Sequence, residues 1–244
     1  MRPIRICIAG VGRMGQAILR SITAKDDLQA ASLWVRDAQQ AADLELPEDI
    51  LTSTDIDEVT AAADVVIDFS LPDATSAVLA AVSRQGKPLV CGVSGLSDEQ
   101  VEKLNAAAGS IAVVYDRNMS MGVAILENIV RQAAVALGND FSVEVHETHH
   151  IHKLDAPSGT ALKLGEAIAA ARGTPAGDIH YEVERRGEVP GDHTVILSSP
   201  TEQLTFGHSV TTRQVFADGA LRAARWVLNQ PPGRYSMQDV LERR

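Results

Sequence analysis

The chain has little cysteine, a deficit of positive charge and no long uninterrupted apolar run. Its two cysteines, Cys7 and Cys91, both lie in short apolar segments that we expect to be strands, which predicts two buried, reduced thiols rather than a disulfide or zinc ligands. No stretch approaches the roughly 20 apolar residues of a membrane span, and the opening apolar run is too short for a signal peptide. These absences predict a soluble cytoplasmic protein without a membrane partner.

Negative charge outweighs positive charge, with 32 Asp and Glu against 22 Lys and Arg and a formal net charge of -10. Long-range repulsion opposes the approach of another polyanion, which argues against nucleic acid as a partner. Any anionic ligand must therefore meet local positive groups. With 244 residues, 45% of them hydrophobic, the chain is long enough to bury a core in one large domain or two small ones.

Strand and helix patterns alternate through the first half of the chain. Short apolar runs at 4–9, 28–35, 65–69, 88–93 and 111–115 are typical of buried strands. Between them, helical patterns follow the glycine turn at 10–15, follow Asp73 as far as Gly86, and run from a capping box at 97–100 to Gly109. This alternation predicts an α/β fold with a Rossmann-like, doubly wound parallel sheet.

The pattern changes after an expected helix at 121–137, which Gly138 ends. Phe141, Val143 and Val145 alternate with polar residues, as in a strand with one solvated face. A helix is expected at 160–172, and strands near 179–183, 195–197 and 204–210. These elements predict a second, α+β domain on a mixed, mostly antiparallel sheet.

Two last helical patterns, at 220–228 and 237–241, are expected to pack back on the first domain. The predicted domains are therefore 1–120 with 214–244 for dinucleotide binding, and 121–213 for substrate binding and oligomerisation.

The sequence G-V-G-R-M-G at 10–15 follows the first expected strand and opens the first expected helix, where a dinucleotide fingerprint must lie. Glycines let the backbone approach a pyrophosphate, whose charge meets the free N–H groups of the helix. The alternative is that these glycines only allow close packing of the strand and helix. We interpret the turn as a site for NADPH or NADH.

The end of the second strand, Trp34-Val35-Arg36-Asp37, bears on the choice of cofactor. If Val35 takes the position of the usual ribose-binding acid, Arg36 can pair with a 2′-phosphate and NADPH is accepted. If Asp37 is that acid, NADH is favoured, and a third possibility is that both charges lie in a solvated loop. The first interpretation is preferred, and both cofactors stay open.

The stretch HETHHIHKLDAPSGTA at 146–161 holds four of the seven histidines. Histidines two apart on a strand share a face, so His146, His150 and His152 could bind a metal with Glu144, or could be surface histidines. An acid/base site explains more residues, because a histidine titrates near neutral pH and Lys153 adds a fixed positive charge.

The turn after Lys153 leads into a helix whose first N–H groups, near Ser158, Gly159 and Thr160, form an anion site. A lysine beside a helix N-terminus is suited to binding a carboxylate or phosphate. Together with a nicotinamide domain, this predicts a reductase of a small acidic substrate, without a metal.

Residues 149–161, H-H-x-H-K-x-D-A-P-S-G-T-A, are very similar to the signature of the 4-hydroxy-tetrahydrodipicolinate reductase family. The resemblance extends over nearly the whole chain through VIDFSLPDA at 66–74, CGVSGL at 91–96, NMSMGV at 118–123 and FADGALRAARW at 216–226. It implies an NAD(P)H-dependent oxidoreductase of lysine and diaminopimelate biosynthesis that reduces a cyclic dicarboxylate with loss of water. It also implies a homotetramer assembled through the second sheet.

The resemblance also implies residue roles. His149 is the implied proton donor or acceptor, and Lys153 is a second proton donor that also holds the substrate. The implied carboxylate-binding residues are His150, Ser158, Gly159, Thr160 and Arg213. The cofactor residues are Gly10, Val11, Gly12, Arg13, Met14, Gly15, Arg36, Gly92, Val93, Ser94, Asp116, Arg117, Asn118 and Met119. His146 and His152 have no assigned role.

The chain departs from the family pattern in three places. Its glycine turn is one residue shorter than the family's G-x-x-G-R-M-G and lacks the expected acidic residue. Residues 92–95 read G-V-S-G instead of G-T-T-G. The region 190–201 is shorter than in many members of the family. The alternatives are a nonenzymatic NAD(P)H-binding sensor and another two-domain NAD(P)-dependent amino-acid dehydrogenase. Intact His149, Lys153, Gly159 and Thr160 argue against the sensor.

Overall fold

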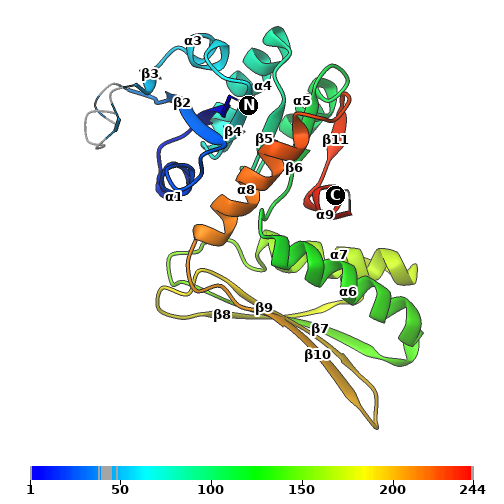
Figure 1. The fold of residues 1–244 in the computed structure, drawn as a ribbon. Helices are drawn as coiled ribbons and strands as arrows, with labels where there is room; N and C mark the ends of the chain where they lie inside the picture. The colour runs from blue at the N-terminus through cyan, green and yellow to red at the C-terminus, as the bar shows by residue number, and fades with distance from the viewer. Residues whose placement is uncertain (1, 38, 40–45, 48, 243–244) are drawn as a thin grey trace. The chain divides into compact units, whose positions relative to one another are not determined.

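The computed structural model describes residues 2–37, 39, 46–47 and 49–242 of the chain. It divides into two compact units, one formed by Met1–Ser120 with Gln214–Arg244 and the other by Met121–Arg213. Each unit has its own sheet, drawn in Figure 1.

The sheet of the first unit is parallel throughout and contains seven strands within the described residues. In sheet order they are β11 (Gly233–Tyr235), β6 (Ala112–Tyr115), β5 (Leu89–Cys91), β4 (Val65–Asp68), β1 (Ile4–Ala9), β2 (Leu28–Trp34) and β3 (Leu51–Ser53). Read from β3 to β6, this is the strand order of a doubly wound dinucleotide-binding fold, to which β11 adds a further edge strand. The expected Rossmann-like sheet is confirmed.

Helices cover both faces of this sheet (Figure 1). They are α1 (Arg13–Ile22), α3 (Ile56–Ala61), α4 (Pro72–Gln85), α5 (Asp98–Ala107), α8 (Gln214–Val227) and α9 (Met237–Glu242). Helices α1 and α8 pack together on one face, while α3, α4 and α5 pack side by side and supply the apolar cluster of the other. The short elements β3, α3 and β11 were not expected from the sequence.

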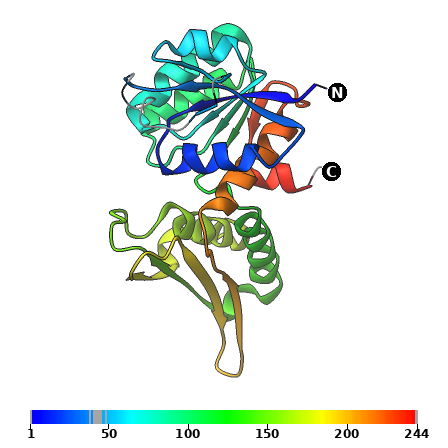
Figure 2. The same cartoon turned by 60° about the vertical axis from the view of Figure 1, so that its left-hand side comes forward.

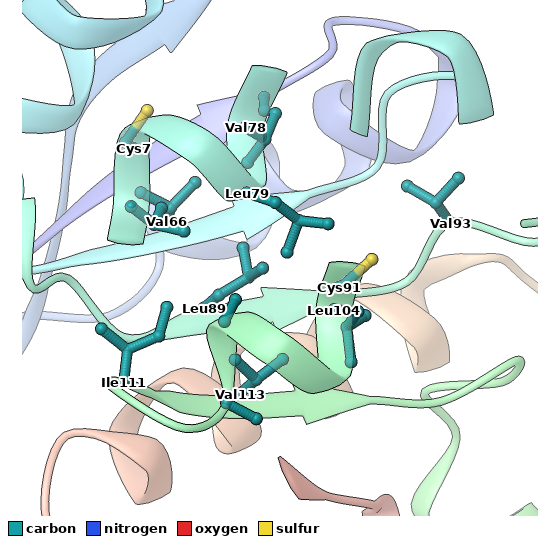
Figure 3. Packing of buried hydrophobic residues seen from close by; sticks show 14 of the residues in the cluster. Cys7, Val66, Val78, Leu79, Leu89, Cys91, Val93, Leu104, Ile111 and Val113 are labelled. Carbon is teal, nitrogen blue, oxygen red and sulfur yellow. The ribbon is translucent and has the colours of Figure 1, made fainter. Parts of the chain in front are cut away.

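Figure 3 shows how side chains from the sheet and from α4 and α5 meet in that cluster. Leu79, Leu89 and Leu104 fill its centre, and Cys7 and Cys91 lie in the same layer as free, fully buried thiols. Burial raises the pKa of Cys7 to about 12 and also raises the pKa of Cys91, so both remain protonated. The expected pair of buried, reduced thiols is confirmed.

The helix ends follow the local sequence. Ser97 and Gln100 form the expected capping box of α5, in which Ser97 Oγ accepts from the Gln100 N–H at 3.3 Å and Gln100 Oε1 accepts from the Ser97 N–H at 2.8 Å. Helix α4 ends at Gly86, whose φ of 64° is a left-handed conformation that glycine adopts without strain.

The second unit is a mixed sheet with two long helices (Figure 2). Its strands, in sheet order, are β10 (Gln203–His208), β9 (Asp192–Ser198), β7 (Ser142–His149) and β8 (His180–Arg185), and the helices are α6 (Met121–Leu137) and α7 (Gly159–Arg172). Short 3-10 helices, η1 (Gly138–Asp140) and η2 (Ala176–Asp178), follow them. Only β7 and β8 run parallel, so the expected mixed, mostly antiparallel sheet is confirmed.

Helices α6 and α7 cover one face of this sheet (Figure 2), and no described helix covers the other. Leu126, Val130 and Ala134 of α6 pack into the core of the unit. The segment Met121–Asp140 is nevertheless long and apolar enough to cross a membrane by length and composition alone, although the sequence predicts no such stretch. Within the structure 33% of the apolar window of this segment is buried, and the buried residues pack on the sheet.

Helix α8 begins at Gln214, six residues before the expected start at 220. The amphipathic pattern was legible only from Ala220 because Gly219 interrupts it. In the structure Gly219 is buried, and a Cβ there would overlap the carbonyl oxygen of Met119. Close packing of α8 on the turn after β6 therefore requires glycine at this position.

We expect Gly219→Ala to destabilise the protein by about 1–3 kcal/mol, the usual cost of overpacking, although Gly→Ala inside a helix normally stabilises. Urea unfolding measures the change. The matched control is Gly177→Ala, because nothing lies within 4 Å of a Cβ there. Equal stability of the two variants would contradict the packing of α8.

Candidate active site

Four neighbouring parallel strands of the first unit end in one row. Ala9 of β1 is paired with Asp68 of β4, Asp68 with Cys91 of β5, and Cys91 with Tyr115 of β6. The turns that follow these strands therefore leave the sheet side by side. In doubly wound folds, ligands bind at this carboxyl edge where the strand order reverses, which here is the turn after β1.

The glycines of the turn at 10–15 are not all required for the same physical reason. Gly10 has a φ of 92°, and a Cβ on it would lie 2.8 Å from the Phe69 carbonyl oxygen, while a Cβ on Gly15 would overlap the Gly10 carbonyl. These two positions need glycine for packing. Gly12 has nothing within 4 Å, and it caps the N-terminus of α1 with its backbone only. Packing explains Gly10 and Gly15 but not Gly12, whose contact with a cofactor stays a prediction.

A cavity of about 430 Å³ opens beside this turn. It is lined by Gly10, Val11, Gly12, Gln16, Trp34, Arg36, Phe69, Ser70, Leu71 and Ala74. Its size is that of a small-molecule site, and the N-terminus of α1 has no acidic residue in its first turn to repel an anion. The residues present fit a dinucleotide.

Of the residues expected to bind the cofactor, Gly10, Val11, Gly12 and Arg36 line the cavity. The sequence interpretation missed the remaining six. Trp34 ends β2, and Phe69 and Ser70 directly follow β4, so their places after buried strands were the signal that could have identified them.

The residues at the end of β2 differ in whether they line the cavity. Val35 is 2% exposed and offers no polar side-chain atom. Arg36 lines the cavity, whereas Asp37, although exposed, is not among the lining residues. Trp34 also lines it, and its indole N–H donates to the Thr54 carbonyl at 3.0 Å, which fixes the ring.

The other expected cofactor residues lie in the turns after β5 and β6 or at the start of α1. Gly92 is required by packing, since a Cβ there would overlap the ring of Phe69. Arg13, Met14 and Gly15 begin α1, Val93 and Met119 are buried, and Ser94 and Arg117 are exposed. Contacts of these residues with a cofactor stay predictions.

Asp116 has a structural use in the turn after β6. Its Oδ1 accepts from the Asn118 N–H at 3.2 Å, and its Oδ2 accepts from the Met237 N–H at 3.1 Å, at the first residue of α9. Asn118 in turn accepts from the Ser120 N–H at 2.8 Å. The expected cofactor segment is therefore held in shape by its own side chains and by the last helix of the unit.

Strand β7 carries the centre of the second unit's site. Its alternation continues through the histidine stretch, so Val143, Val145, Glu147 and His149 are buried while the residues between them are at least partly exposed. His193 is the first buried position of the neighbouring strand β9. Two histidines and a carboxylate thus meet inside the unit.

Their distances define a tight cluster. His149 Nδ1 lies 3.4 Å from Glu147 Oε2, and His193 Nε2 lies 4.0 Å from the same oxygen. The two imidazole rings contact each other edge to face, with centroids 5.1 Å apart. Gly191 packs closely against this ring, because a Cβ at that position would lie 2.9 Å from His149 Nε2.

The carboxylate of Glu147 is also bound from two other elements. Arg185, the last residue of β8, places Nη1 and Nη2 each 3.2 Å from Glu147 Oε1. The Ser158 N–H donates to both carboxylate oxygens, at 3.0 and 3.1 Å. Ser158 Oγ accepts from the Ala161 N–H at 3.1 Å as the N-cap of α7. Both polar groups of Ser158 are therefore engaged within the protein.

The loop between β7 and α7 carries a second, more exposed pair. Lys153 Nζ lies 2.8 Å from Asp155 Oδ1. Burial acts against it, but hydrogen bonds from the Lys153 ammonium and the N–H groups of Asp155 and Gly159, with the charge of Lys153, lower the pKa of Asp155. Lysine and the start of α7 thus bind a carboxylate of the chain itself.

Both buried histidines are neutral at pH 7. Burial, together with the charges of Lys153 and Arg185, lowers the pKa of His149 to about 4 against the opposing charges of Glu147 and Asp155. Burial and the neighbouring His149 lower the pKa of His193 to about 3. A neutral imidazole carries one proton and one free lone pair, so each ring can donate and accept one hydrogen bond.

Among the described residues, Glu147, His149 and His193 form the one group of three whose ligand atoms come within 4.8 Å, the geometry that a metal requires. Arg185 and the Ser158 N–H already neutralise that carboxylate, which disfavours a second cation there. The alternative metal set with Glu144 is not brought together, because Glu144 pairs with His146 at 2.9 Å on the partly exposed face and His152 pairs with Glu188 at 3.4 Å.

The remaining expected residues are placed as follows. His150 follows His149 directly, and its ring lies 6.1 Å from that of His152. Gly159 and Thr160 are the first two residues of α7, and Arg213 is the last residue of the second unit. The sequence interpretation missed Glu147, Asp155, Arg185 and His193. Continuing the strand alternation of β7 and β9 toward the histidines would have identified Glu147 and His193.

Comparison with known proteins agrees along nearly the whole chain. Residues 4–119 match the model described as dihydrodipicolinate reductase, N-terminus, and residues 122–241 match dihydrodipicolinate reductase, C-terminus. A 4-hydroxy-tetrahydrodipicolinate reductase of Caulobacter vibrioides is 42% identical over 260 residues, covering 98% of each chain. One of Halorhodospira halophila is 38% identical over 96% of this chain and 97% of its own.

Solved structures show the same fold. Dipicolinate-bound dihydrodipicolinate reductase from Paenisporosarcina sp. TG-14 has a TM-score of 0.82 at 20% identity, covering 97% of this chain and 99% of its own. GenD2 from gentamicin A biosynthesis, in complex with NAD, has a TM-score of 0.67 at 14% identity, covering 94% and 86%. From the two family models and the relatives that match nearly end to end, the chain belongs to the dihydrodipicolinate reductase family, the 4-hydroxy-tetrahydrodipicolinate reductases.

Proposed function

We propose that the chain, an NAD(P)H-dependent oxidoreductase of this family, reduces 4-hydroxy-tetrahydrodipicolinate to tetrahydrodipicolinate in lysine and diaminopimelate biosynthesis, in the cytoplasm. The balanced reaction takes up one hydride and one proton and releases one water. The observation that carries the proposal is the match to both family models at residues 4–119 and 122–241. The unit of Met1–Ser120 with Gln214–Arg244 would hold the dinucleotide, and Met121–Arg213 the substrate.

The dinucleotide would lie with its pyrophosphate at the turn 10–15 and the start of α1, where backbone N–H groups meet phosphate charge. When bound, the nicotinamide supplies the hydride. Gly10, Val11, Gly12, Arg13, Met14 and Gly15 would hold it with Arg36, Gly92, Val93, Ser94, Asp116, Arg117, Asn118 and Met119. The cavity lined by Gly10, Val11 and Gly12 supports the roles of the turn residues. Packing does not require glycine at position 12, which is consistent with a ligand approaching the backbone there.

In the substrate unit, Lys153 and the first N–H groups of α7, at Gly159 and Thr160, would bind the substrate's carboxylates together with His150 and Arg213. Ser158, whose N–H and Oγ are engaged within the protein, would support them as the N-cap of α7. The Lys153–Asp155 pair supports this, because these groups already bind a carboxylate. Asp155 is 56% exposed on its side chain, so a substrate carboxylate can displace it into water.

His149 would move the proton, at Nε2 beside Gly191. Its imidazole is neutral in the free protein, since burial holds its pKa at about 4. A bound dicarboxylate adds two negative charges nearby and raises that pKa, so proton uptake would accompany substrate binding. Lys153 would serve as the second proton donor.

We expect the purified protein to oxidise NAD(P)H when freshly made 4-hydroxy-tetrahydrodipicolinate is added, followed by the loss of NAD(P)H absorbance. His149→Gln and Lys153→Ala should each lower kcat by about 10²-fold or more, the usual contribution of an acid/base group. NADPH affinity should be unchanged, because both residues lie in the other unit.

His146→Gln is the matched control, since His146 lies on the partly exposed face of the same strand and should keep its kcat. If neither NADPH nor NADH is oxidised above background, the proposed enzymatic activity is wrong. Loss of NADPH binding in the His149 or Lys153 variants would mean that their roles are wrongly assigned.

The cofactor preference follows from the end of β2. We propose that Arg36 pairs with the 2′-phosphate of NADPH, because it lines the cavity while Val35 is buried and Asp37 is not a lining residue. Arg36→Ala should lower kcat/KM for NADPH by about 10-fold or more, the loss of one charge-assisted hydrogen bond of about 1.5–3 kcal/mol. The kcat/KM for NADH should stay nearly constant. An unchanged NADPH preference would contradict this role, and Asp37→Asn is the matched control.

We propose further that the protein is a homo-oligomer, a tetramer by family resemblance, assembled through the sheet face that no described helix covers. Ile196 of β9 lies on that face, opposite Glu144 of β7. Ile196→Lys should shift the mass measured by light scattering from four chains toward one, whereas Gln132→Lys at an exposed position of α6, on the opposite side of the sheet, should not. A single-chain mass for the unmodified protein would refute the proposal.

A further inference from the structure

Glu147 is a carboxylate that the proposed chemistry does not use. Its side chain is 0% exposed, so no solvent and no substrate atom reaches it without rearrangement. A buried charge is costly unless protein groups satisfy it. Here the hydrogen-bond donors are Arg185 of β8 and the Ser158 N–H at the start of α7, and His149 Nδ1 lies 3.4 Å from the same carboxylate.

The contact with His149 has a chemical consequence. Nδ1 of His149 is buried and makes no hydrogen bond within the described residues, but it lies 3.4 Å from Glu147 Oε2, while Nε2 lies next to Gly191. In a neutral imidazole one nitrogen carries the proton, and a carboxylate beside Nδ1 favours the proton there. The lone pair is then left on Nε2, on the side where the proton of the reaction would be exchanged.

Arg185 binds the same carboxylate and the loop that carries Lys153. Its Nη1 and Nη2 contact Glu147, its Nε donates to the Lys153 carbonyl at 3.3 Å, and its Nη2 donates to the Asp155 carbonyl at 2.5 Å. Only a guanidinium offers donors in a fixed fork that can reach all three acceptors. One side chain therefore sets the path of the backbone on both sides of Leu154.

We infer that Glu147 and Arg185 are positioning residues for the reaction: Glu147 fixes the tautomer and orientation of the His149 ring, and Arg185 ties the loop of Lys153 and Asp155 to the same carboxylate. The inference rests on the proposed roles of His149 and Lys153. Glu147 has no exposed side-chain surface, and Arg185 is engaged with Glu147 and with the carbonyls of Lys153 and Asp155, so each is proposed to act through the residues that it holds.

The charged and titratable groups around His149 come from four segments of the unit. They are Glu147 on the same strand, Lys153 and Asp155 on the following loop, Arg185 on β8 and His193 on β9. Of these, Glu147 approaches Nδ1, and its negative charge favours the protonated ring. Removing that charge while keeping the side-chain shape lowers the pKa of His149 and should therefore shift the limb of the kcat/KM profile that His149 controls to lower pH.

The first test is the tautomer itself, measured by ¹⁵N NMR of histidine-labelled protein without substrate, with the His149 signals assigned by their loss in His149→Gln. The unmodified protein should show the proton on Nδ1. Glu147→Gln should transfer it to Nε2, because the amide can turn its N–H group toward Nδ1. An Nε2 proton in the unmodified protein, or an unchanged tautomer in Glu147→Gln, would overturn the inference.

The second test is kinetic. Glu147→Gln should lower kcat by about 10²-fold with little change in KM, while Glu147→Asp, which keeps the charge, should recover part of the loss. Arg185→Lys should raise the KM for the dicarboxylate by about 10-fold, because it loosens the loop of Lys153. NADPH affinity should stay constant in all three.

The matched controls are Glu144→Gln on the partly exposed face of β7 and Arg186→Lys, whose exposed side chain pairs with Glu184. Equal kinetics of each variant and its control would overturn the inference. If Glu147→Gln does not fold, Glu147→Asp and Arg185→Lys still decide, since unchanged kcat and KM in both would refute it. Inactivity of the unmodified protein would refute the proposed function instead. The tautomer measurement needs no activity, so it would still test whether Glu147 sets the tautomer of His149.

Discussion

The burial of one carboxylate organises the second unit. Glu147 lies without solvent on β7, so its charge requires donors from within the protein. Arg185 supplies them from β8 and the Ser158 N–H from the start of α7, and each connection places a different part of the site. Strand register alone would bring β7 and β8 together, but it would not set where α7 begins or how the loop between them runs.

A different constraint organises the first unit, where the missing side chains matter more than those present. Gly10, Gly15 and Gly92 are needed because backbone or the Phe69 ring occupies the place of a Cβ. Their packing brings the turns after β1, β4 and β5 close together at one sheet edge. Gly12 then stands open to the cavity, so the same short sequence provides both tight packing and an exposed backbone.

The sequence predicts the helices and strands of this fold because their buried faces impose a regular spacing of apolar residues. The long helices and the described strands other than β3 and β11 were predicted, as was the end of α6 at Gly138. The start of α8 was not predicted, because Gly219 is required by close packing against Met119 although glycine has a low helix propensity. At the site, His149 and Lys153 were found within one contiguous motif. Arg185 and His193 are distant in sequence, and only the pairing of β8 and β9 with β7 places them beside Glu147.

The two ion pairs of the substrate unit differ in exposure, and this difference separates binding from positioning. Asp155 is 56% exposed and its partner Lys153 22%, so water can take over either group when an incoming carboxylate replaces Asp155. Such an exchange leaves the net charge of the lysine pair unchanged, which suits a protein whose overall charge repels anions. Glu147 and Arg185 cannot exchange in this way, because separating them would leave a buried charge unpaired. The exposed pair is therefore suited to recognise a substrate, and the buried pair to hold its geometry constant while that exchange takes place.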